Sequence, residues 1–295
     1  VQSPICLGFN FFHAADDFLV SQEHSYPPAS TVEGFRHGIE LNSYLLGAGE
    51  FKKTGRPVPI ETDVHIGIKP YGMNWAFKEV LNHFGNAIEK AIGEHIDVII
   101  FAGDLFDKPR PPNRAIKTVI DAVSKAIAKG IKVYSVLGDH DLPKVADIPP
   151  QMLIPGLKLF GFKSVNYIDC FTVNNIEYCI GGVSHYPLKY GTQLKDKLLS
   201  EINYVAKQLN NKSVLILHQN ISNYNMLEPG LDLSELPDKP RYIAMGHLHR
   251  RIIDRRMNGQ VVAYPGSLDI IKKDEIGEWK KNGKGFYLID LSSDE

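Results

Sequence analysis

Carboxylate and imidazole side chains stand at five separate points of the sequence, each where an apolar stretch ends. The five motifs, in chain order, are Asp63-Val64-His65, Gly103-Asp104-Leu105-Phe106-Asp107, Gly138-Asp139-His140-Asp141, Leu217-His218-Gln219-Asn220 and Gly246-His247-Leu248-His249. In Asp-x-His and His-x-His, the two side chains lie on the same side of an extended segment, so both can reach one centre. Alone, each motif is most often a turn or a surface feature. The ordered set of five predicts a single polar site.

These residue types also indicate the chemistry of the site. Carboxylate and imidazole ligands without thiolate suit Mn²⁺, Fe²⁺ or Zn²⁺ better than Ca²⁺ or a structural zinc site. The seven or eight ligand groups are too many for one ion and suit two ions roughly 3.5–4 Å apart. Two metal ions at this spacing stabilise the attacking and leaving oxygens of an in-line displacement at phosphorus. The motifs therefore predict a two-metal centre that hydrolyses phosphoesters.

Strands and helices must position these motifs. From about residue 58, apolar strands alternate with amphipathic helices, and each motif follows a strand. Strands are predicted over residues 58–64, 98–102, 132–137, 213–217, 242–245 and 286–291, and helices over 75–92, 113–128 and 194–209. We expect Asn113 to cap the second helix and Met257-Asn258-Gly259 to turn a hairpin. This order favours an α/β fold with a central mixed β-sheet flanked by helices, in which ligands gather outside the carboxyl ends of the strands.

Length and composition limit the kind of protein. The 295 residues are 43% hydrophobic and 23% charged, as in an ordinary globular chain. The formal net charge of −1 gives no general attraction to nucleic acid, so local basic patches would have to bind phosphate. No apolar run reaches the ~18 residues of a membrane span, and the first residues lack the features of a secretory signal. We therefore expect a cytoplasmic protein, nucleoid-associated in a prokaryote, with no membrane contact.

Two of the three cysteines fall opposite each other in a predicted hairpin. Asn174-Asn175 suits a two-residue turn, which pairs Cys170 with Cys179. Cross-strand neighbours are close enough for a disulfide. A reducing cytosol favours the alternative of two buried free thiols, which is the prediction here.

The five motifs resemble those of the calcineurin-like metallophosphoesterases, and the resemblance extends over about residues 58–291. Within that superfamily, three segments resemble the meiotic-recombination-eleven and SbcD type of DNA repair nuclease. They are Gly103-Asp104-Leu105-Phe106-Asp107, Tyr264-Pro265-Gly266-Ser267-Leu268 and Lys284-Gly285-Phe286-Tyr287-Leu288. Asp139 in the third motif favours an archaeal source. The resemblance implies the metallophosphoesterase fold, a mixed β-sheet sandwich flanked by helices.

The resemblance also implies a role for each residue of the site. It assigns the ligands as Asp63, His65 and His249 for a first metal, Asp139, His218 and His247 for a second, and Asp104 as a bridge between both. His140 would stabilise charge at the scissile phosphate and protonate the leaving oxygen, and Asp141 would orient the His140 imidazole. The implied cofactor is two divalent ions, with Mn²⁺ expected and Fe²⁺ or Zn²⁺ as alternatives.

The same resemblance implies partners. Nucleases of this family process DNA together with an SMC-like coiled-coil repair ATPase. A homodimer would form through the helix from Asn113 and the stretch 152–160. Phosphate contacts are predicted at basic residues beside the second and fifth motifs, namely Lys108, Arg110, Arg114, Arg250 and Arg251.

The chain departs from the family in three places. Asp139 stands where the superfamily commonly has Asn, and the added charge should tighten cation binding. Residues 1–57 form an N-terminal segment of unknown role without a family counterpart. The nuclease domain is expected over residues 58–295, with the C-terminal capping domain of the family absent.

Three hypotheses of function stay open at this point. The leading one is a Mn²⁺-dependent DNA exonuclease and endonuclease of double-strand-break repair. The second is a small-molecule phosphodiesterase or protein phosphatase on the same scaffold. The third, a catalytically silent binding module, ranks last because every metal position is filled.

Overall fold

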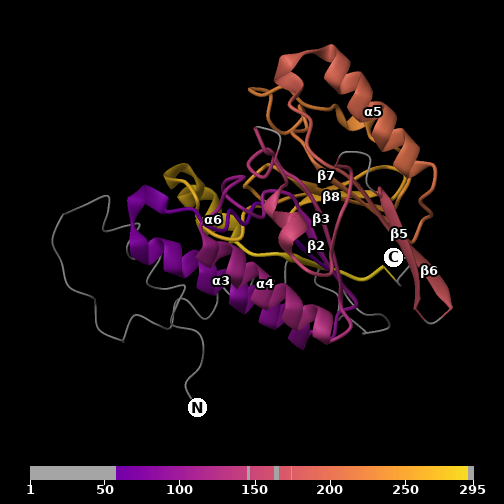
Figure 1. The fold of residues 1–295 in the computed structure, drawn as a ribbon. Helices are drawn as coiled ribbons and strands as arrows, with labels where there is room; N and C mark the ends of the chain where they lie inside the picture. The colour runs from indigo at the N-terminus through magenta and orange to yellow at the C-terminus, as the bar shows by residue number, and fades with distance from the viewer. Residues whose placement is uncertain (1–57, 145–146, 163–165, 174, 292–295) are drawn as a thin grey trace.

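The computed structural model of the chain describes residues 58–144, 147–162, 166–173 and 175–291 (Figure 1). The segment 1–57, including Cys6, lies outside the described residues, so the predicted separate role of this segment stays a prediction. Element labels follow Figure 1.

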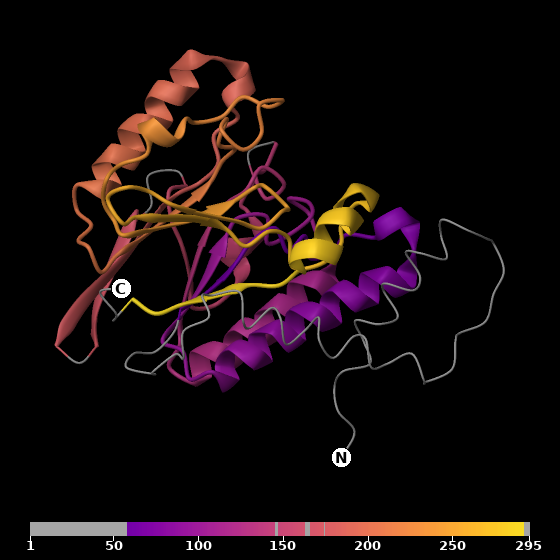
Figure 2. The ribbon, with the colours of Figure 1, turned by 180° about the vertical axis from the view of Figure 1, so that it is seen from behind.

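Two mixed β-sheets pack face to face, and helices cover their outer faces (Figures 1 and 2). The first sheet has the order β11-β1-β2-β3-β4, with β1 (Val58–Glu61), β2 (Val98–Ala102), β3 (Lys132–Val136), β4 (Leu157–Leu159) and β11 (Tyr287–Ile289). The second has the order β5-β6-β7-β8-β10-β9, with β5 (Ile168–Val173), β6 (Ile176–Val183), β7 (Val214–His218), β8 (Tyr242–Gly246), β9 (Ile252–Arg255) and β10 (Val261–Tyr264). Neighbours are parallel except at β11–β1, β5–β6 and β10–β9. The predicted mixed sandwich flanked by helices is confirmed.

Helices cover both sides of this sandwich. The first sheet carries α3 (Asn74–Gly93) and α4 (Asn113–Ala128), and the second carries α5 (Thr192–Ala206). The short helix α6 (Ile276–Asn282) packs beside the start of α3 (Figure 1). Single 3₁₀ turns lie at Pro70–Gly72, Pro150–Leu153, Leu188–Tyr190, Leu233–Glu235 and Lys273–Glu275. The three long helices appear where the periodicity predicted them, within about two or three residues at each end.

The molecule has four layers, namely α3 with α4, the first sheet, the second sheet and α5, and a cluster of apolar side chains fills each of the three spaces between them. Strand β2 shows why its sequence is continuously apolar: Ile100 points between the sheets, whereas Ile99 and Phe101 point towards α3 and α4. A strand buried on both faces has no solvent side on which a polar residue would be favourable. Burial of both faces fixes the carboxyl end of β2, where the second motif begins.

The predicted cap of α4 is wrong. Asn113 is the first helical residue, Pro112 occupies the capping position, and no side chain caps the helix. Pro112 has an extended ψ of 142°, and its ring fixes φ, so the helix begins at the next residue. Asn113 is therefore already inside the helix and cannot occupy the capping position.

The predicted hairpin is confirmed, but the predicted state of its cysteines is wrong. Val173 pairs with Ile176, and Cys170 stands opposite Cys179. The two sulfurs are bonded, with the Cα atoms 4.1 Å apart. Cys170 is exposed and Cys179 is buried, so they are not two buried thiols.

Candidate metal centre

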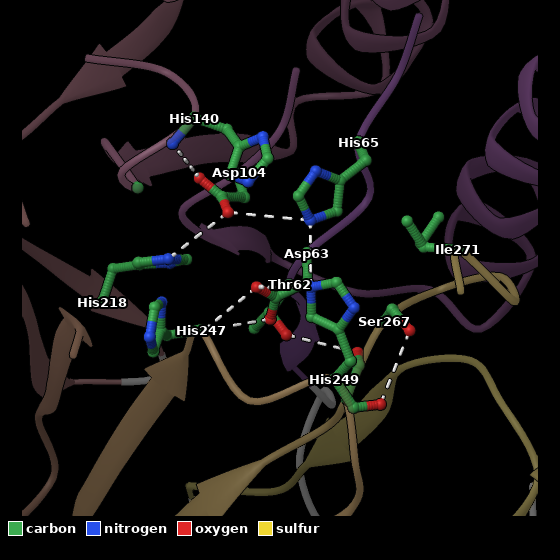
Figure 3. Close-up of polar contacts among 12 residues, drawn as sticks. Thr62, Asp63, His65, Asp104, His140, His218, His247, His249, Ser267 and Ile271 are labelled. Atoms are coloured by element: carbon green, nitrogen blue, oxygen red, sulfur yellow. Dashed lines mark hydrogen bonds and ion pairs between the residues drawn. The ribbon is translucent and has the colours of Figure 1, made fainter. Parts of the chain in front are cut away.

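The five motifs meet at one place, outside the carboxyl ends of β1, β2 and β3 in the first sheet and of β7 and β8 in the second (Figure 3). Parallel strands bring their carboxyl ends to one edge of each sheet. The two edges face each other, as the bridge between Thr62 and Ser267 and the hydrogen bonds from His247 N to the Asp63 carboxylate demonstrate. The site is therefore a seam between the two sheets.

The backbone at the site is unusual. Four polar residues of the motifs have positive φ: Asp63 (48°), His65 (49°), Asp104 (48°) and His247 (104°). Such conformations cost on the order of 1–3 kcal/mol each and persist only where surrounding contacts enforce them. Here the enforcing contacts include His65 N to Asp104 O at 2.9 Å and Asp63 N to Gly103 O at 3.2 Å. The first motif is thus a pair of sharp bends rather than the extended segment expected, and β1 ends at Glu61.

The first ligand set is the candidate group Asp63, His65 and His249, which could hold a metal ion because its ligand atoms all lie within 4.8 Å of one another. His65 Nε2 faces His249 Nε2 at 3.1 Å, and His249 Nε2 is 3.9 Å from Asp63 Oδ1 (Figure 3). On its outer side, His249 Nδ1 lies 2.7 Å from Glu275 Oε1. Burial acts to raise the pKa of Glu275, but His249 and Lys284 outweigh it and lower the pKa to about 2. An ionised carboxylate only accepts, so His249 donates from Nδ1, and Nε2 is the nitrogen directed at the site.

The second ligand set is the candidate group Asp139, His218 and His247, whose ligand atoms also lie within 4.8 Å of one another. Asp139 Oδ1 is 3.4 Å from His218 Nε2 and 3.2 Å from His247 Nδ1. His218 Nδ1 donates to Ala102 O at 2.8 Å, so its Nε2 faces the site. His247 Nε2 lies 3.0 Å from Glu228 Oε2. Burial acts to lower the pKa of His247, but hydrogen bonds to Asp139 and Glu228 raise it to about 9.

Asp104 stands between the two ligand sets. Its Oδ2 lies 3.6 Å from His65 Nε2 and 3.6 Å from His218 Nε2 (Figure 3). Its Oδ1 accepts a hydrogen bond from His140 N at 2.9 Å. Burial, and then the charges of Asp139, Asp141 and other nearby carboxylates, raises the pKa of Asp104 well above its usual range. A buried group of carboxylates of this kind is stabilised by a cation.

The two ligand sets fit divalent cations. His65 Nε2 and His249 Nε2 are within hydrogen-bond distance of each other at 3.1 Å, so without a metal one of them donates to the other. A cation bound by both nitrogens would replace that shared proton, and metal–nitrogen bonds of about 2.0–2.1 Å allow this. His218 Nε2 is buried, lies 3.4 Å from Asp139 Oδ1 and 3.6 Å from Asp104 Oδ2, and makes no well-aligned hydrogen bond among the described residues. Neither set contains a thiolate, a composition that suits Mn²⁺, Fe²⁺ or Zn²⁺.

His140 lies beside the site, and both it and Asp141 make their hydrogen bonds to the backbone. The His140 Nδ1 atom donates to the backbone oxygen of Asp107 at 2.9 Å. The buried Asp141 carboxylate instead accepts from three backbone amides, those of Leu105, Phe106 and Gly138, at 3.0–3.3 Å. Asp141 therefore ties the loop of the second motif to that of the third. The hydrogen bonds of Asp141 are thus to the backbone, and the predicted role of Asp141 in orienting His140 stays a prediction.

Sequence reasoning missed three polar residues of the site. Glu275 and Glu228 contact the outer nitrogens of His249 and His247, and both lie in segments without periodicity. His185 donates from Nδ1 to His218 O at 3.0 Å, and burial lowers its pKa to about 4. A signal for His185 did exist, since it follows the apolar strand β6 as the ligands follow theirs.

The five predicted phosphate contacts do not all reach the surface. Arg251 does not present its charge at the surface, because its guanidinium nitrogens are buried and its Cζ lies 5.3 Å from the centre of the Tyr287 ring. Arg110 is exposed and paired with Asp147 at 3.1 Å. The remaining three are exposed, namely Lys108, Arg114 and Arg250.

Residues 58–251 match the calcineurin-like phosphoesterase family, and the chain belongs to it. The assignment made from the five motifs is confirmed. A protein named DNA double-strand break repair protein Mre11 from Methanocaldococcus jannaschii is 34% identical over 236 residues, covering 79% of this chain and 62% of the relative. Proteins of the same name from Sulfurisphaera tokodaii and Saccharolobus solfataricus are 32% and 33% identical, covering 79% of this chain and 59% and 60% of their own lengths. The chain thus spans about three fifths of these curated relatives.

Among solved structures, a dimetal phosphatase from Danio rerio is similar, with a TM-score of 0.49, 10% identity and coverage of 79% of this chain and 91% of the other. Of the helices in the described part of the chain, none combines the length and apolarity of a segment that crosses a membrane.

Proposed function

We propose that this chain hydrolyses phosphodiester bonds of DNA with two divalent ions, Mn²⁺ being the expected one, as an exonuclease and endonuclease of double-strand-break repair. The observation that carries the proposal is Asp104, whose Oδ2 lies 3.6 Å from a nitrogen of each ligand set. A single carboxylate between two sets suits a pair of ions. The relatives named as DNA repair proteins support DNA as the substrate.

The first and second ligand sets would each hold one ion, with Asp104 shared. When bound, the ions supply Lewis-acid activation of water and neutralise charge on the phosphodiester. The protein contributes a rigid arrangement of ligands. The proton on His249 Nδ1 and the one on His218 Nδ1 are each fixed by an acceptor, which leaves Nε2 of both rings directed at the site.

His140 is the residue proposed to act on the phosphate. Its Nδ1 is engaged by Asp107 O, which leaves Nε2 on the side open to substrate, and the side chain is 41% exposed. In its protonated form this ring can stabilise charge at phosphorus and give a proton to the leaving oxygen. Asp141 would act through the backbone, because it fixes the amide of Gly138 and those of two residues after Asp104.

A path for the DNA backbone is proposed over the first turns of α3 and α4. Arg114, together with Lys78, lines a hollow of about 300 Å³ between these helices. Both helices begin at the edge of the sheet that carries the ligand sets. Lys108 and Arg250 would add phosphate contacts nearer the metals, and Arg110 would have to leave Asp147 to do so.

The protein partners are also part of the proposal. The SMC-like coiled-coil ATPase and a homodimer are expected by family resemblance. For the homodimer, Ile148, Met152 and Leu153 beside α4 are about half exposed, which supports this face. Ile154 and Phe160 of the predicted stretch are buried and belong to the core instead.

Cleavage of an end-labelled DNA duplex and single strand, with Mn²⁺, Mg²⁺ or EDTA, tests the proposal. We expect Mn²⁺-dependent cutting that falls about 10²–10⁴-fold in His140→Ala, the range for loss of a general acid. The metal content of this variant should stay at that of the unmodified protein. Intact hydrolysis of an aryl phosphodiester without cutting of any DNA would reject DNA as substrate and favour a small-molecule phosphodiesterase.

A further inference from the structure

Two of the family-like segments carry no ligand of the proposed metal centre. They are Tyr264-Pro265-Gly266-Ser267-Leu268 and Lys284-Gly285-Phe286-Tyr287-Leu288. In the structure, Ser267 of the first and Lys284 of the second converge on one buried carboxylate, Glu275. We propose that Glu275, held by Lys284 and Ser267, is a positioning residue that fixes the proton and the orientation of the His249 imidazole for metal binding. This inference rests on the proposed function.

The contacts of Glu275 are numerous and come only from donors. Its Oε2 accepts from Lys284 Nζ at 2.6 Å, from Ser267 Oγ at 3.0 Å and from Ile271 N at 3.2 Å. Its Oε1 lies 2.7 Å from His249 Nδ1. A carboxylate in which every partner donates is ionised, and it leaves His249 no choice of tautomer. The inward nitrogen, Nε2, is then the one with a lone pair.

Lys284 completes the arrangement from the other side. Its ammonium group donates to His249 O at 2.9 Å, to Ser267 Oγ at 2.5 Å and to Glu275 Oε2. Lys284 and Glu275 are both almost fully buried, at 7% and 8% exposure. A buried ion pair tolerates the loss of one member poorly, because the other charge is left without compensation. One cation therefore fixes both the backbone and, through Glu275, the ring of the same ligand.

This network is well suited to hold a metal ligand in one orientation. A histidine ligand gains basicity and a fixed ring plane when its outer nitrogen donates to a carboxylate, and loss of that contact typically lowers metal affinity 10–100-fold. Here the carboxylate is shielded from water, so solvent does not replace it. The two family-like segments thereby acquire a function, since each supplies one residue that holds Glu275.

The test uses Glu275→Gln and the double variant Glu275→Gln/Lys284→Met, in which no buried ammonium is left unpaired. Glu278→Gln, in the helix α6 that directly follows Glu275 and paired with Asn282, is the control. Titration of the metal-free full chain with Mn²⁺ should show one of two ions weakened about 10–100-fold in both Glu275 variants, and unchanged affinities in the control. Melting curves identify a variant that does not fold, in which case the double variant decides.

A second measurement is independent of any metal. Nitrogen-15 spectra of the histidines in the metal-free protein should show His249 protonated on Nδ1, and a mixture of tautomers in both Glu275 variants. Unchanged tautomer and unchanged ion affinities would overturn the inference. If the unmodified chain binds no second ion, the proposed function fails, and the spectra still decide whether Glu275 fixes His249.

Discussion

The first and second ligand sets contain the same types of side chain, but their surroundings differ. Asp63 of the first set is 0% exposed, whereas Asp139 of the second is 39% exposed. The carboxylate behind His249 is Glu275, 8% exposed and tied to Lys284, whereas the one behind His247 is Glu228, 47% exposed. Because water screens and replaces contacts at the second set, equal ligand types do not imply equal affinities. We expect the first set to hold its ion tightly and the second set to hold the weaker ion, which exchanges readily.

The largest effect should follow from removing the residue common to both sets. In Asp104→Ala, both ions lose a ligand and the buried site loses its central charge, so hydrolysis should fall to background and both affinities should drop. Metal titration and cleavage assays measure this, with Asp121→Ala on the exposed face of α4 as control. Loss of only one ion would show that Asp104 belongs to one set.

A pH series should separate the two sets. The pKa of His247 is raised to about 9, so this imidazole is protonated at neutral pH and an ion must displace that proton. The affinity of the weaker ion should therefore rise about tenfold per pH unit between about pH 6 and about pH 8, and level off near the pKa. Manganese titrations across this range give the slope. Equal slopes for both ions would contradict the difference between the sets.

The smallest effect is expected at Glu228. In Glu228→Gln, an exposed carboxylate is replaced and water can take over its contact with His247, so the weaker ion should lose less than about tenfold in affinity. The matched comparison is Glu275→Gln under identical conditions. If the Glu228 variant loses more affinity than the Glu275 variant, the proposed ranking of the two sets is reversed.

Much of this site could be predicted, because ligands that follow strands share an edge of a sheet. The strand ends at Asp63, Asp104 and His218 are set by apolar runs that are visible in the sequence. Glu275 and Glu228 could not be found in this way. They reach the site from irregular segments, and only the tertiary packing brings them to the histidines.

The errors have related physical causes. Asp141 was assigned to the imidazole next to it in sequence, yet its carboxylate accepts from the backbone amides of Leu105, Phe106 and Gly138. Arg251 was taken for a surface cation, but β11 brings Tyr287 over its guanidinium. Leu105, Phe106 and Tyr287 are distant in sequence from the residues that they contact, so no local pattern reports these contacts. The disulfide was missed for another reason. The predicted register of Cys170 and Cys179 was correct, but a reducing cytosol was assumed, which favours free thiols.

The antiparallel pairing of β1 with β11 has a consequence for how this unit can be connected. Val58 stands opposite Ile289, so the described unit starts and finishes at neighbouring points of one sheet, at the end of β1 remote from the ligand sets. A chain with adjacent ends is a good substrate for circular permutation. In a variant restricted to residues 58–291, joining these two ends by a short Gly-Ser linker and opening the exposed turn at Met257 should thus preserve the metal centre. The family match stops at residue 251, but a chain cut there would lack Glu275, Lys284 and the edge strand that covers β1.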